Sequence, residues 1–218
     1  MSDLKPLLAE ARGHLYSAVV GDVMDRLGHR EHFLPPQIRP LDPSMVVLGF
    51  AAPAIIEDRP GTNEDPFGRL LEALDALKEG DVYITNGGAT PYALWGELMA
   101  TRATHLKAAG CVLNGYHRDT EGILAVNFPT FSWGGYALDI CFRGRVADYG
   151  VPARVGGIPV SPGDIVFGDR DGVLIVPQAI AEEVFRVALE KVQSENLVRD
   201  GFRQGMPAVE AFAKYGVM

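Results

Sequence analysis

The chain has 218 residues, of which 47% are hydrophobic and 22% charged, and its formal net charge is −8. This balance is ordinary for a soluble globular protein, and the length is sufficient to bury a sizeable core. The acidic charge argues against a nucleic-acid-binding groove, because phosphate binding needs concentrated positive charge. The acidic net charge does not exclude small anionic substrates, since one arginine or one helix N-terminus can bind an anion locally.

The beginning of the sequence, MSDLKPLLAEARGHLYSAVV, lacks a basic segment followed by a continuous apolar block, so we expect no secretory signal. The longest apolar run, MVVLGFAAPAII, is too short and too interrupted to span a bilayer. Cys111 and Cys141 lie within apolar runs and lack metal-type spacing, which predicts two small buried side chains in a reducing compartment. We therefore expect a cytoplasmic protein with neither a membrane nor a nucleic acid as partner.

Apolar periodicity predicts several helices along the chain. In chain order they cover residues 3–12, 17–28, 66–78, a segment ending at Gly110, 178–198 and part of 206–218. Ser17 is a suitable N-cap for the second of these helices, and Gly28 is a suitable stop.

Short apolar runs bounded by turn residues predict the strands. They fall at residues 45–57, 82–88, 111–115, 128–135, 140–150 and 151–177. Gly49 and Pro53 should interrupt the first run, giving one or two strands. Turns at Ser161–Asp164 and Asp169–Gly172 should form β-hairpins. Because strands alternate with helices, the sequence predicts one compact α/β domain with a mixed sheet.

The stretch NGGATPYALWGEL joins a strand, two glycines and the start of a helix. Free backbone amides at such a junction can bind a carboxylate or a phosphate, although most glycine turns only change the chain direction. Thr90 and Pro91 are suitable as N-cap and first helical residue. If the helix instead begins near Trp95, the free amides are those of residues 96–99. The sequence leaves both starting points open.

The helix that follows carries an apolar stripe that should pack on the sheet. Its members are Leu94, Leu98, Met99, Ala103 and Leu106. Glu97, taken alone, fits a solvated first-turn acid that the helix dipole favours.

Arg118 and Asp119 follow a short strand and a turn, where α/β proteins commonly place functional groups. Arginine can bind a carboxylate with two parallel hydrogen bonds, and aspartate is a hard oxygen ligand for magnesium or manganese. The alternative is a surface ion pair or a turn cap. The functional interpretation is favoured because the helix and return strand between Glu97 and Arg118 should bring both ends to one edge of the sheet.

Several motifs together resemble one known family. They are similar to motifs of the family of the regulator of ribonuclease activity A (RraA). The motifs are the stretch GGATPYALWGEL, an acid separated by twenty residues from the pair RD, the stretch FPTFSWG, and the stretch GGIPVSPGDIVFGDRDGVLIVP. This family includes class II pyruvate aldolases acting on 4-hydroxy-4-methyl-2-oxoglutarate and 4-carboxy-4-hydroxy-2-oxoadipate. The likeness runs from about Ser17 to the C-terminus. Members are often labelled demethylmenaquinone methyltransferases, but this sequence has no glycine-rich methyl-donor fingerprint.

The resemblance implies a single-domain swivelling β/β/α fold over residues 1–218, with a mixed sheet, flanking helices and a C-terminal helical extension from about 178 to 218. It also implies a homotrimer or homohexamer with active sites between subunits. An α-keto acid would be bound by the side chain of Arg118 and by backbone amides. Those amides belong to Gly96, Glu97, Leu98 and Met99.

The same resemblance implies a site for Mg²⁺ or Mn²⁺. Asp119 would bind the ion directly, and Glu97 would do so through a water molecule. A glutamate from the C-terminal helix of a neighbouring subunit would complete the site, with Glu195 as the best match and Glu190 as the alternative. Two residues depart from the family pattern. Asn114 stands where relatives usually have aspartate. His117 places an imidazole beside the RD pair, where it either touches substrate or fills space, and we favour the second role.

These features predict a metal-dependent lyase in which Arg118, Asp119 and Glu97 are catalytic. Retro-aldol cleavage and β-decarboxylation of oxaloacetate both leave a pyruvate enolate, whose charge a divalent cation can neutralise. No lysine belongs to this set, which argues against a Schiff base. One alternative is a non-catalytic protein that binds a ribonuclease or a helicase, as the name-giving members do. Another is an aldolase for other hydroxy-keto or sugar acids.

Overall fold

The computed structural model describes residues 4–61 and 65–217. Its helices are α1 (Leu4–Ala11), α2 (Ser17–Arg26), α3 (Leu70–Asp75), α4 (Glu97–His105), α5 (Thr120–Ala125), the 3-10 turn η1 (Gln178–Ile180), α6 (Ala181–Arg203) and α7 (Ala208–Tyr215). Its strands are β1 (Arg39–Pro40), β2 (Val47–Asp58), β3 (Asp81–Thr85), β4 (Ala93–Trp95), β5 (Gly110–Leu113), β6 (Tyr116–His117), β7 (Thr130–Ser132), β8 (Gly144–Tyr149), β9 (Ala153–Val155), β10 (Ile158–Val160), β11 (Ile165–Asp169) and β12 (Gly172–Val176). Residue 3 of the first predicted helix, and residues 1–3, 62–64 and 218 of the predicted domain, lie outside the described ranges.

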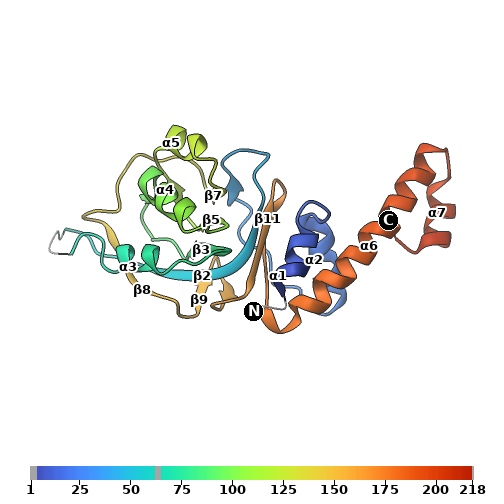
Figure 1. Ribbon diagram of the computed structural model, residues 1–218, viewed down its shortest axis with the longest axis horizontal. Helices are drawn as coiled ribbons and strands as arrows, with labels where there is room; N and C mark the ends of the chain where they lie inside the picture. The colour runs from blue at the N-terminus through green and yellow to red at the C-terminus, as the bar shows by residue number, and fades with distance from the viewer. Residues whose placement is uncertain (1–3, 62–64, 218) are drawn as a thin grey trace.

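Eight strands form one curved, mixed sheet in the order β1-β7-β5-β3-β2-β11-β12, and β8 pairs with the far end of β2 (Figure 1). The neighbours β2, β3, β5 and β7 run parallel, because a helix joins each of them to the next. The strands β1, β8, β11 and β12 pair antiparallel. The predicted α/β class with a mixed sheet and flanking helices is confirmed.

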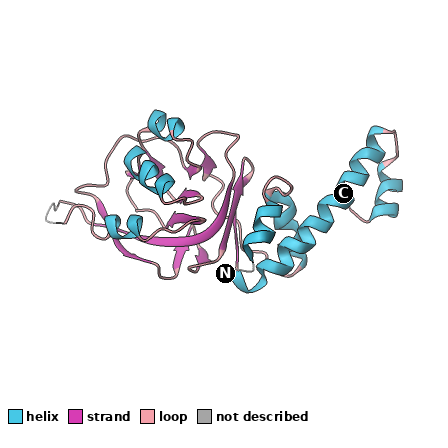
Figure 2. Cartoon of the chain, in the orientation of Figure 1, coloured by secondary structure: helices cyan, strands magenta, loops and turns pink. Residues whose placement is uncertain are grey.

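Alternate residues of the strands point into different hydrophobic cores. On β3, Val82 and Ile84 belong to the core inside the curved sheet, while Tyr83 packs in the core under α3, α4 and α5. On β11, Val166 points inward and Phe167 packs against α1, α2 and α6. The two groups of helices therefore cover different parts of the sheet's outer surface (Figure 2).

β2 is one continuous strand of 12 residues, so the predicted interruptions at Gly49 and Pro53 are wrong. Along one edge, β2 changes partner from β11 at Val47–Phe50 to β8 at Ala54–Asp58. Pro53 lies between these two partners, where its missing N–H costs no ladder bond. Gly49 is needed for a close approach, since a Cβ there would lie 2.2 Å from the carbonyl oxygen of Gly80.

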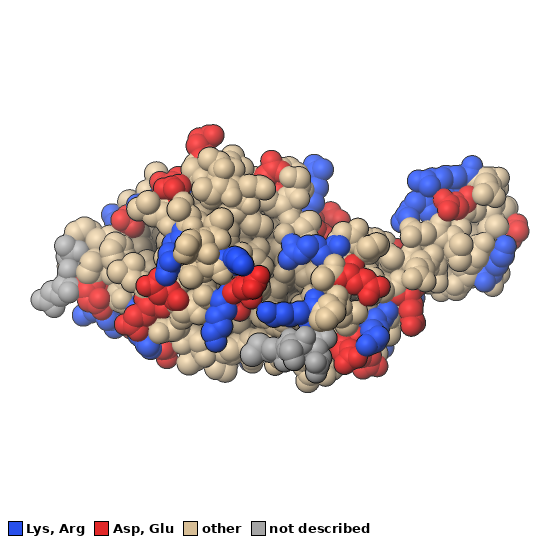
Figure 3. Space-filling model, in the orientation of Figure 1, with Lys and Arg blue, Asp and Glu red and all other residues tan. Residues whose placement is uncertain are grey.

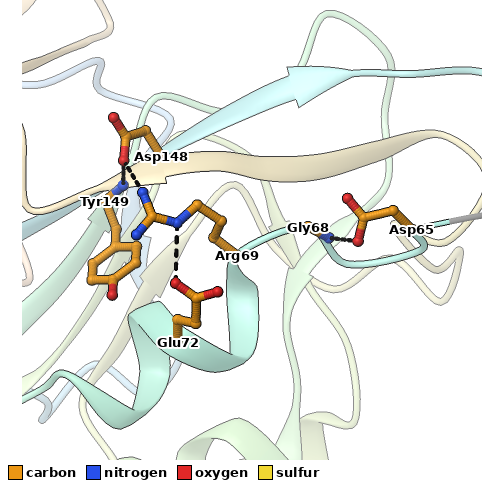
Figure 4. A network of polar contacts seen from close by, with 6 residues as sticks. All are labelled: Asp65, Gly68, Arg69, Glu72, Asp148 and Tyr149. Carbon is orange, nitrogen blue, oxygen red and sulfur yellow. Dashed lines mark hydrogen bonds and ion pairs between the residues drawn. The ribbon is translucent and has the colours of Figure 1, made fainter.

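The helix predicted at 66–78 is shortened to α3, because the chain before it joins β8 instead. The N–H of Arg69 donates to the carbonyl of Val146 at 2.9 Å. The Arg69 guanidinium binds Asp148 at 2.6 Å and Glu72 at 3.1 Å, and it lies 4.4 Å from the centre of the Tyr149 ring (Figure 4). These contacts fix the loop before α3 to the sheet.

α4 also differs from its prediction at both ends. The short strand β4 occupies the segment after Thr90–Pro91, so the helix begins at Glu97. It ends at His105, because Lys107 adopts a left-handed conformation with φ of 59° before Gly110 opens β5. The predicted strand at 140–150 likewise begins only at Gly144.

α2 begins at Ser17, which is therefore not its N-cap. Both the amide and the hydroxyl of Ser17 donate to the carboxylate of Asp169, at 2.6 and 2.7 Å. This aspartate opens the two-residue turn between β11 and β12, where the predicted hairpin at Asp169–Gly172 is confirmed. The Ser161–Asp164 turn exists but joins strands that pair with other partners, so it is no hairpin. Gly28, with φ of 89°, follows the end of α2 as predicted.

The end of α6 and α7 form a projecting pair of helices that we call the C-terminal arm, residues 196–217 (Figure 1). α6 runs five residues beyond the predicted end at 198. The arm buries only a few apolar side chains: Val198, Ala211 and Val217. Phe202, Val209 and Phe212 remain 40%, 83% and 56% exposed. None of the helices in the described ranges is long and apolar enough to cross a membrane; the cytoplasmic location stays a prediction.

Cys111 is fully buried as predicted, and burial raises the pKa of its thiol to about 12, which disfavours a reactive thiolate. Cys141 is only partly buried, in the turn before β8, so its prediction as a core residue is wrong. Acidic and basic side chains are interspersed over the described part of the face in Figure 3, and no broad basic surface appears there.

Candidate functional site

The amino end of α4 presents backbone amides that the helix itself does not use. Gly96 is the N-cap, with an extended backbone (φ −150°, ψ −179°). The first hydrogen bond of the helix runs from the N–H of Ala100 to the carbonyl of Gly96, at 3.1 Å. The N–H groups of Glu97, Leu98 and Met99 therefore precede the helical ladder, as the later of the two predicted starting points requires.

The short parallel pair of β4 and β6 brings a second helix terminus beside the first. The N–H of Arg118 donates to the carbonyl of Trp95 at 2.9 Å. Asp119 then takes the N-cap position of α5 in the left-handed region, with φ of 58° and ψ of 42°. That conformation is uncommon for a residue other than glycine, and the Asp119 side chain makes no capping hydrogen bond to α5.

Instead, the Asp119 carboxylate lies over the amino end of α4. The N–H of Glu97 points to Asp119 Oδ2, at 3.4 Å between nitrogen and oxygen. A Cβ on Gly96 would lie 2.6 Å from the same oxygen and 3.5 Å from Cγ of Arg118. Only glycine at this position leaves room for the carboxylate, so the sequence specifies the approach of Asp119 to α4.

Arg118 is held loosely between two acids. Its Nε lies 3.7 Å from Asp119 Oδ2, and its Nη1 lies 3.4 Å from Asp139 Oδ2. The side chains of Arg118, Asp119 and Asp139 are 38%, 50% and 37% exposed. Since these pairs are long and partly exposed, the guanidinium retains donors for a substrate carboxylate.

Sequence reasoning missed Asp139. It comes from the loop between β7 and β8, which is joined to β4 by the N–H of Ala93 donating to the carbonyl of Leu138 at 2.7 Å. The surrounding letters YALDICFRG contain no motif that would mark it, so only the three-dimensional pairing identifies this residue.

The Glu97 side chain points elsewhere. Its Oε1 accepts a hydrogen bond from the Thr101 hydroxyl at 2.8 Å. The aliphatic part of the Glu97 side chain packs on Gly122 of α5, where an added Cβ would lie 2.3 Å from Glu97 Cγ. Thus the backbone of Glu97 meets Asp119, whereas its carboxylate contacts neither Asp119 nor Arg118. Its predicted role through a water molecule stays a prediction.

The predicted apolar stripe of α4 is partly wrong. Leu98 is 80% exposed in the first turn, beside the free amides, and Leu94 lies on β4 rather than on the helix. The residues that α4 buries are the small ones, Ala100 and Ala103. Leu98 is exposed because α4 begins only at Glu97, which turns the residues of its first turn away from the sheet.

His117 does more than fill space. It is buried, and Nδ1 lies 2.7 Å from the Ser132 hydroxyl while Nε2 lies 3.1 Å from the Thr120 hydroxyl. Burial lowers the pKa of His117, so the ring is neutral at neutral pH. Asn114 donates from Nδ2 to the carbonyl of Asn86 at 2.8 Å, which an aspartate could not do. Asn114 therefore fastens the glycine turn.

Glu195 lies in a different cluster, on α6. Its carboxylate accepts a hydrogen bond from the Tyr16 hydroxyl and pairs with Lys191 at 3.1 Å. Lys191 is buried and also pairs with Asp22. Burial, reinforced by the bond to Glu195, raises the pKa of Tyr16 to about 12. Within one chain, Glu195 is not brought to Arg118 and Asp119; Glu190 is exposed on the same helix.

The residues around Asp119 could hold a divalent cation only together with oxygens of a bound substrate. Within residues 4–61 and 65–217, no group of three or more histidine, cysteine, aspartate or glutamate side chains could hold a metal ion. Asp119 offers a half-exposed carboxylate whose protein contacts all involve Oδ2. Magnesium commonly keeps several waters and binds through one or two carboxylates plus substrate oxygens, so one aspartate beside an anion site is a suitable donor set.

Known proteins are similar to this chain in sequence. The chain is 27% identical to protein DlpA of Legionella pneumophila over 98% of its own length, but it spans only 34% of that protein. It is 28% identical to a provisionally named 4-hydroxy-4-methyl-2-oxoglutarate aldolase of Halalkalibacterium halodurans, covering 88% of this chain and 87% of the relative.

A solved structure is similar to this chain in fold. RraAS2 of Streptomyces coelicolor, described as an unusual member of the RNase ES inhibitor RraA protein family, superposes with a TM-score of 0.76 at 26% identity, covering 88% of this chain and 95% of that one. The family model RraA-like, described as Aldolase/RraA, matches residues 17–175. This match includes β4, α4 and the Arg118–Asp119 pair, and the chain belongs to the RraA-like family.

Proposed function

We propose that the chain is a divalent-metal-dependent lyase that releases pyruvate by retro-aldol cleavage of a 4-hydroxy-2-oxo dicarboxylic or tricarboxylic acid. We propose that it also decarboxylates oxaloacetate. The observation that carries the proposal is the convergence of three kinds of group at the amino end of α4: the Arg118 guanidinium, the Asp119 carboxylate and unused backbone amides. Relatives provisionally named as aldolases support it.

In this proposal, the carboxylate of the α-keto acid is bound by Arg118 and by the amides of residues 96–99. Asp119 would hold Mg²⁺ or Mn²⁺, and Glu97 would assist through a water molecule. When bound, the divalent cation supplies Lewis-acid stabilisation of negative charge on substrate oxygens. The positive end of the α4 dipole adds to the attraction for an anion.

Arg118 and the α4 amides are fixed donors before the reaction begins. Such groups stabilise developing negative charge without having to reorganise. Both cleavage of a 4-hydroxy-2-oxo acid and loss of CO₂ from oxaloacetate place negative charge on the same pyruvoyl unit, so one set of donors suits both. Among the described residues, no lysine contacts Arg118, Asp119 or Glu97, which favours this route over a Schiff base.

A neighbouring subunit completes the site in our proposal, in a homotrimer or homohexamer. Glu195 is the proposed acid, with Glu190 as the alternative. Tyr16 and Lys191 fix the Glu195 carboxylate, yet each of its oxygens can accept a further hydrogen bond. Exposed apolar side chains occur both on the arm, at Phe212, and beside the site, at Leu98. Burial of both surfaces between subunits would be favourable.

The test is a coupled pyruvate assay with a panel of 4-hydroxy-2-oxo acids, oxaloacetate and related sugar acids, each with Mg²⁺ and with chelator. The proposal expects pyruvate only when metal is present, and its loss in Asp119→Asn. Metal-independent release, or full activity of that variant, would refute it. Release from sugar acids alone would keep the lyase but change its substrate class.

The second candidate is a non-catalytic regulator that binds a ribonuclease or a helicase. This candidate is favoured by the similarity to RraAS2, which is described as a member of an RNase inhibitor family. It expects no turnover of any acid in the panel, together with saturable binding of a purified ribonuclease.

A further inference from the structure

We propose that His117 is a positioning residue that holds Asp119 in its left-handed conformation and so aims its carboxylate at the amino end of α4. His117 does this through two hydroxyls, those of Ser132 and Thr120, and we call these three residues the His117 bridge. The inference rests on the proposed function, because that function gives the Asp119 carboxylate its role.

The His117 bridge spans the Arg118–Asp119 pair. Nδ1 of His117 lies 2.7 Å from Ser132 Oγ on β7, and Nε2 lies 3.1 Å from Thr120 Oγ1 at the start of α5. A neutral imidazole has one donor and one acceptor nitrogen, which matches two hydroxyl partners. Ser132 is the last residue of β7, so the bridge is anchored to the main sheet. Its Oγ also accepts the N–H of Gly134 at 3.1 Å.

Asp119 needs such support because its own side chain does not stabilise its backbone. Its φ of 58° lies where residues with a Cβ are disfavoured, and its carboxylate makes no cap to α5. On the N-terminal side, the Arg118 N–H is fixed to the Trp95 carbonyl at 2.9 Å. On the C-terminal side, Thr120 is fixed by the His117 ring. With Thr120 released, Asp119 can relax toward a commoner conformation, and its carboxylate then leaves Gly96.

The surroundings argue against a purely space-filling ring. A cavity of about 240 Å³ adjoins the bridge and is lined by Gln37 and Arg39 as well as by His117, Thr120 and Ser132. The ring leaves this space unfilled, whereas two hydroxyls hold both of its nitrogens. The polar contacts of the ring, rather than its packing, are therefore its distinguishing feature.

Thr120→Val tests the bridge by removing one hydroxyl while keeping the shape of the side chain, and Thr120→Ser restores the hydroxyl. The measurement is Mn²⁺ binding in the presence of pyruvate, by isothermal titration calorimetry, together with the melting temperature. We expect Mn²⁺ affinity about 10–100-fold weaker in Thr120→Val, the range seen when partners of metal ligands are removed. Thr120→Ser should bind within about threefold of the wild type.

Thr130→Val is the matched control. The buried Thr130 hydroxyl, also on β7, donates to the Phe128 carbonyl at 3.0 Å and lies outside the bridge. This variant should lower the melting temperature and leave Mn²⁺ affinity unchanged. If Thr120→Val behaves like Thr130→Val, the bridge is only structural and the inference is overturned.

A crystal structure of Thr120→Val separates this inference from the proposed function. If wild type and Asp119→Asn bind Mn²⁺ equally well, the proposed metal role of Asp119 fails, whatever the bridge does. The bridge is then judged by the backbone alone: an Asp119 φ that leaves the left-handed region supports it. A φ that stays near its wild-type value in Thr120→Val overturns it.

Discussion

In both the Lys191 cluster and the Arg118 cluster one cation lies between two acids, but the two clusters differ in burial and in how closely the charges are paired. Lys191 is 4% exposed and is paired closely with Asp22 and with Glu195. Arg118 is 38% exposed, and its acids lie 3.4 and 3.7 Å away. The first cluster joins α6 to α2, whereas the second lies where two helices begin.

This difference indicates that the Lys191 cluster stabilises the fold, whereas the Arg118 cluster is a candidate binding site. A buried charge must be fully paired, since removing one partner leaves an uncompensated charge out of water. Loosely paired and partly exposed charges contribute little to stability, so their arrangement around free amides needs another explanation. Substitution of Arg118 should therefore mainly change ligand binding, and substitution of Lys191 should mainly change folding stability.

The largest effect is expected for Asp119→Asn. It keeps the shape of the side chain but removes the charge that would hold a divalent cation, so metal-dependent pyruvate release should fall about 10²–10³-fold or more. Steady-state assays with and without chelator measure it. The melting temperature should stay within a few degrees of the wild type, and a large drop would instead make Asp119 a folding residue.

The next effect is expected for Gly96→Ala. The added Cβ would meet Asp119 Oδ2 at 2.6 Å, so the carboxylate must move and pyruvate release should fall about tenfold or more. Gly172→Ala is the matched control, because its Cβ would meet only ordinary contacts at 3.8 and 3.9 Å. Equal activity in the two variants would show that the approach of Asp119 to α4 is unimportant.

A smaller effect, mainly on folding stability, is expected for Lys191→Met. Removing the buried cation leaves Glu195, whose side chain is only 15% exposed, without its ion-pair partner and should lower the free energy of unfolding by about 3 kcal/mol in urea titrations. Lys107→Met is the control, since Lys107 is 73% exposed and lies 4.0 Å from Glu79. That change should cost at most about 0.5 kcal/mol. Similar losses in both variants would contradict the structural role of the Lys191 cluster.

The smallest effect concerns His32, which is 3% exposed. Burial lowers its pKa in the folded protein. The unfolded chain takes up this proton near pH 6.5, whereas the folded chain resists it, so stability should fall as the pH drops below about 6.5. The slope is at most about 1.4 kcal/mol per pH unit and should flatten in His32→Gln. Urea titrations at pH 7.5 and 5.5 test this, with exposed His29→Gln as control.

The α/β class, the hairpin at Asp169–Gly172 and the end of α2 just before Gly28 could be predicted because each depends on local residue chemistry. The continuity of β2 through Pro53 could not, because it depends on a change of partner strand. The shortening of α3 likewise follows from pairing with β8, which no local pattern encodes.

The candidate site was predictable to a similar extent. Arg118 and Asp119 could be chosen from their place after a strand, and Gly96 from the glycine turn. The left-handed backbone of Asp119, the contribution of Asp139 and the bonds of His117 could not, since they arise from the β4–β6 pair and the loop before β8. The exposure of Leu98 followed from the late start of α4, which the sequence left open.

The most direct test of the central claim is the position of Mn²⁺ and pyruvate in crystals of the protein, located by the anomalous scattering of manganese. The account predicts the ion on the Asp119 carboxylate, with the pyruvate carboxylate on Arg118 and on the amides of Glu97–Met99. Manganese and pyruvate bound elsewhere, with the amino end of α4 occupied only by solvent, would contradict it.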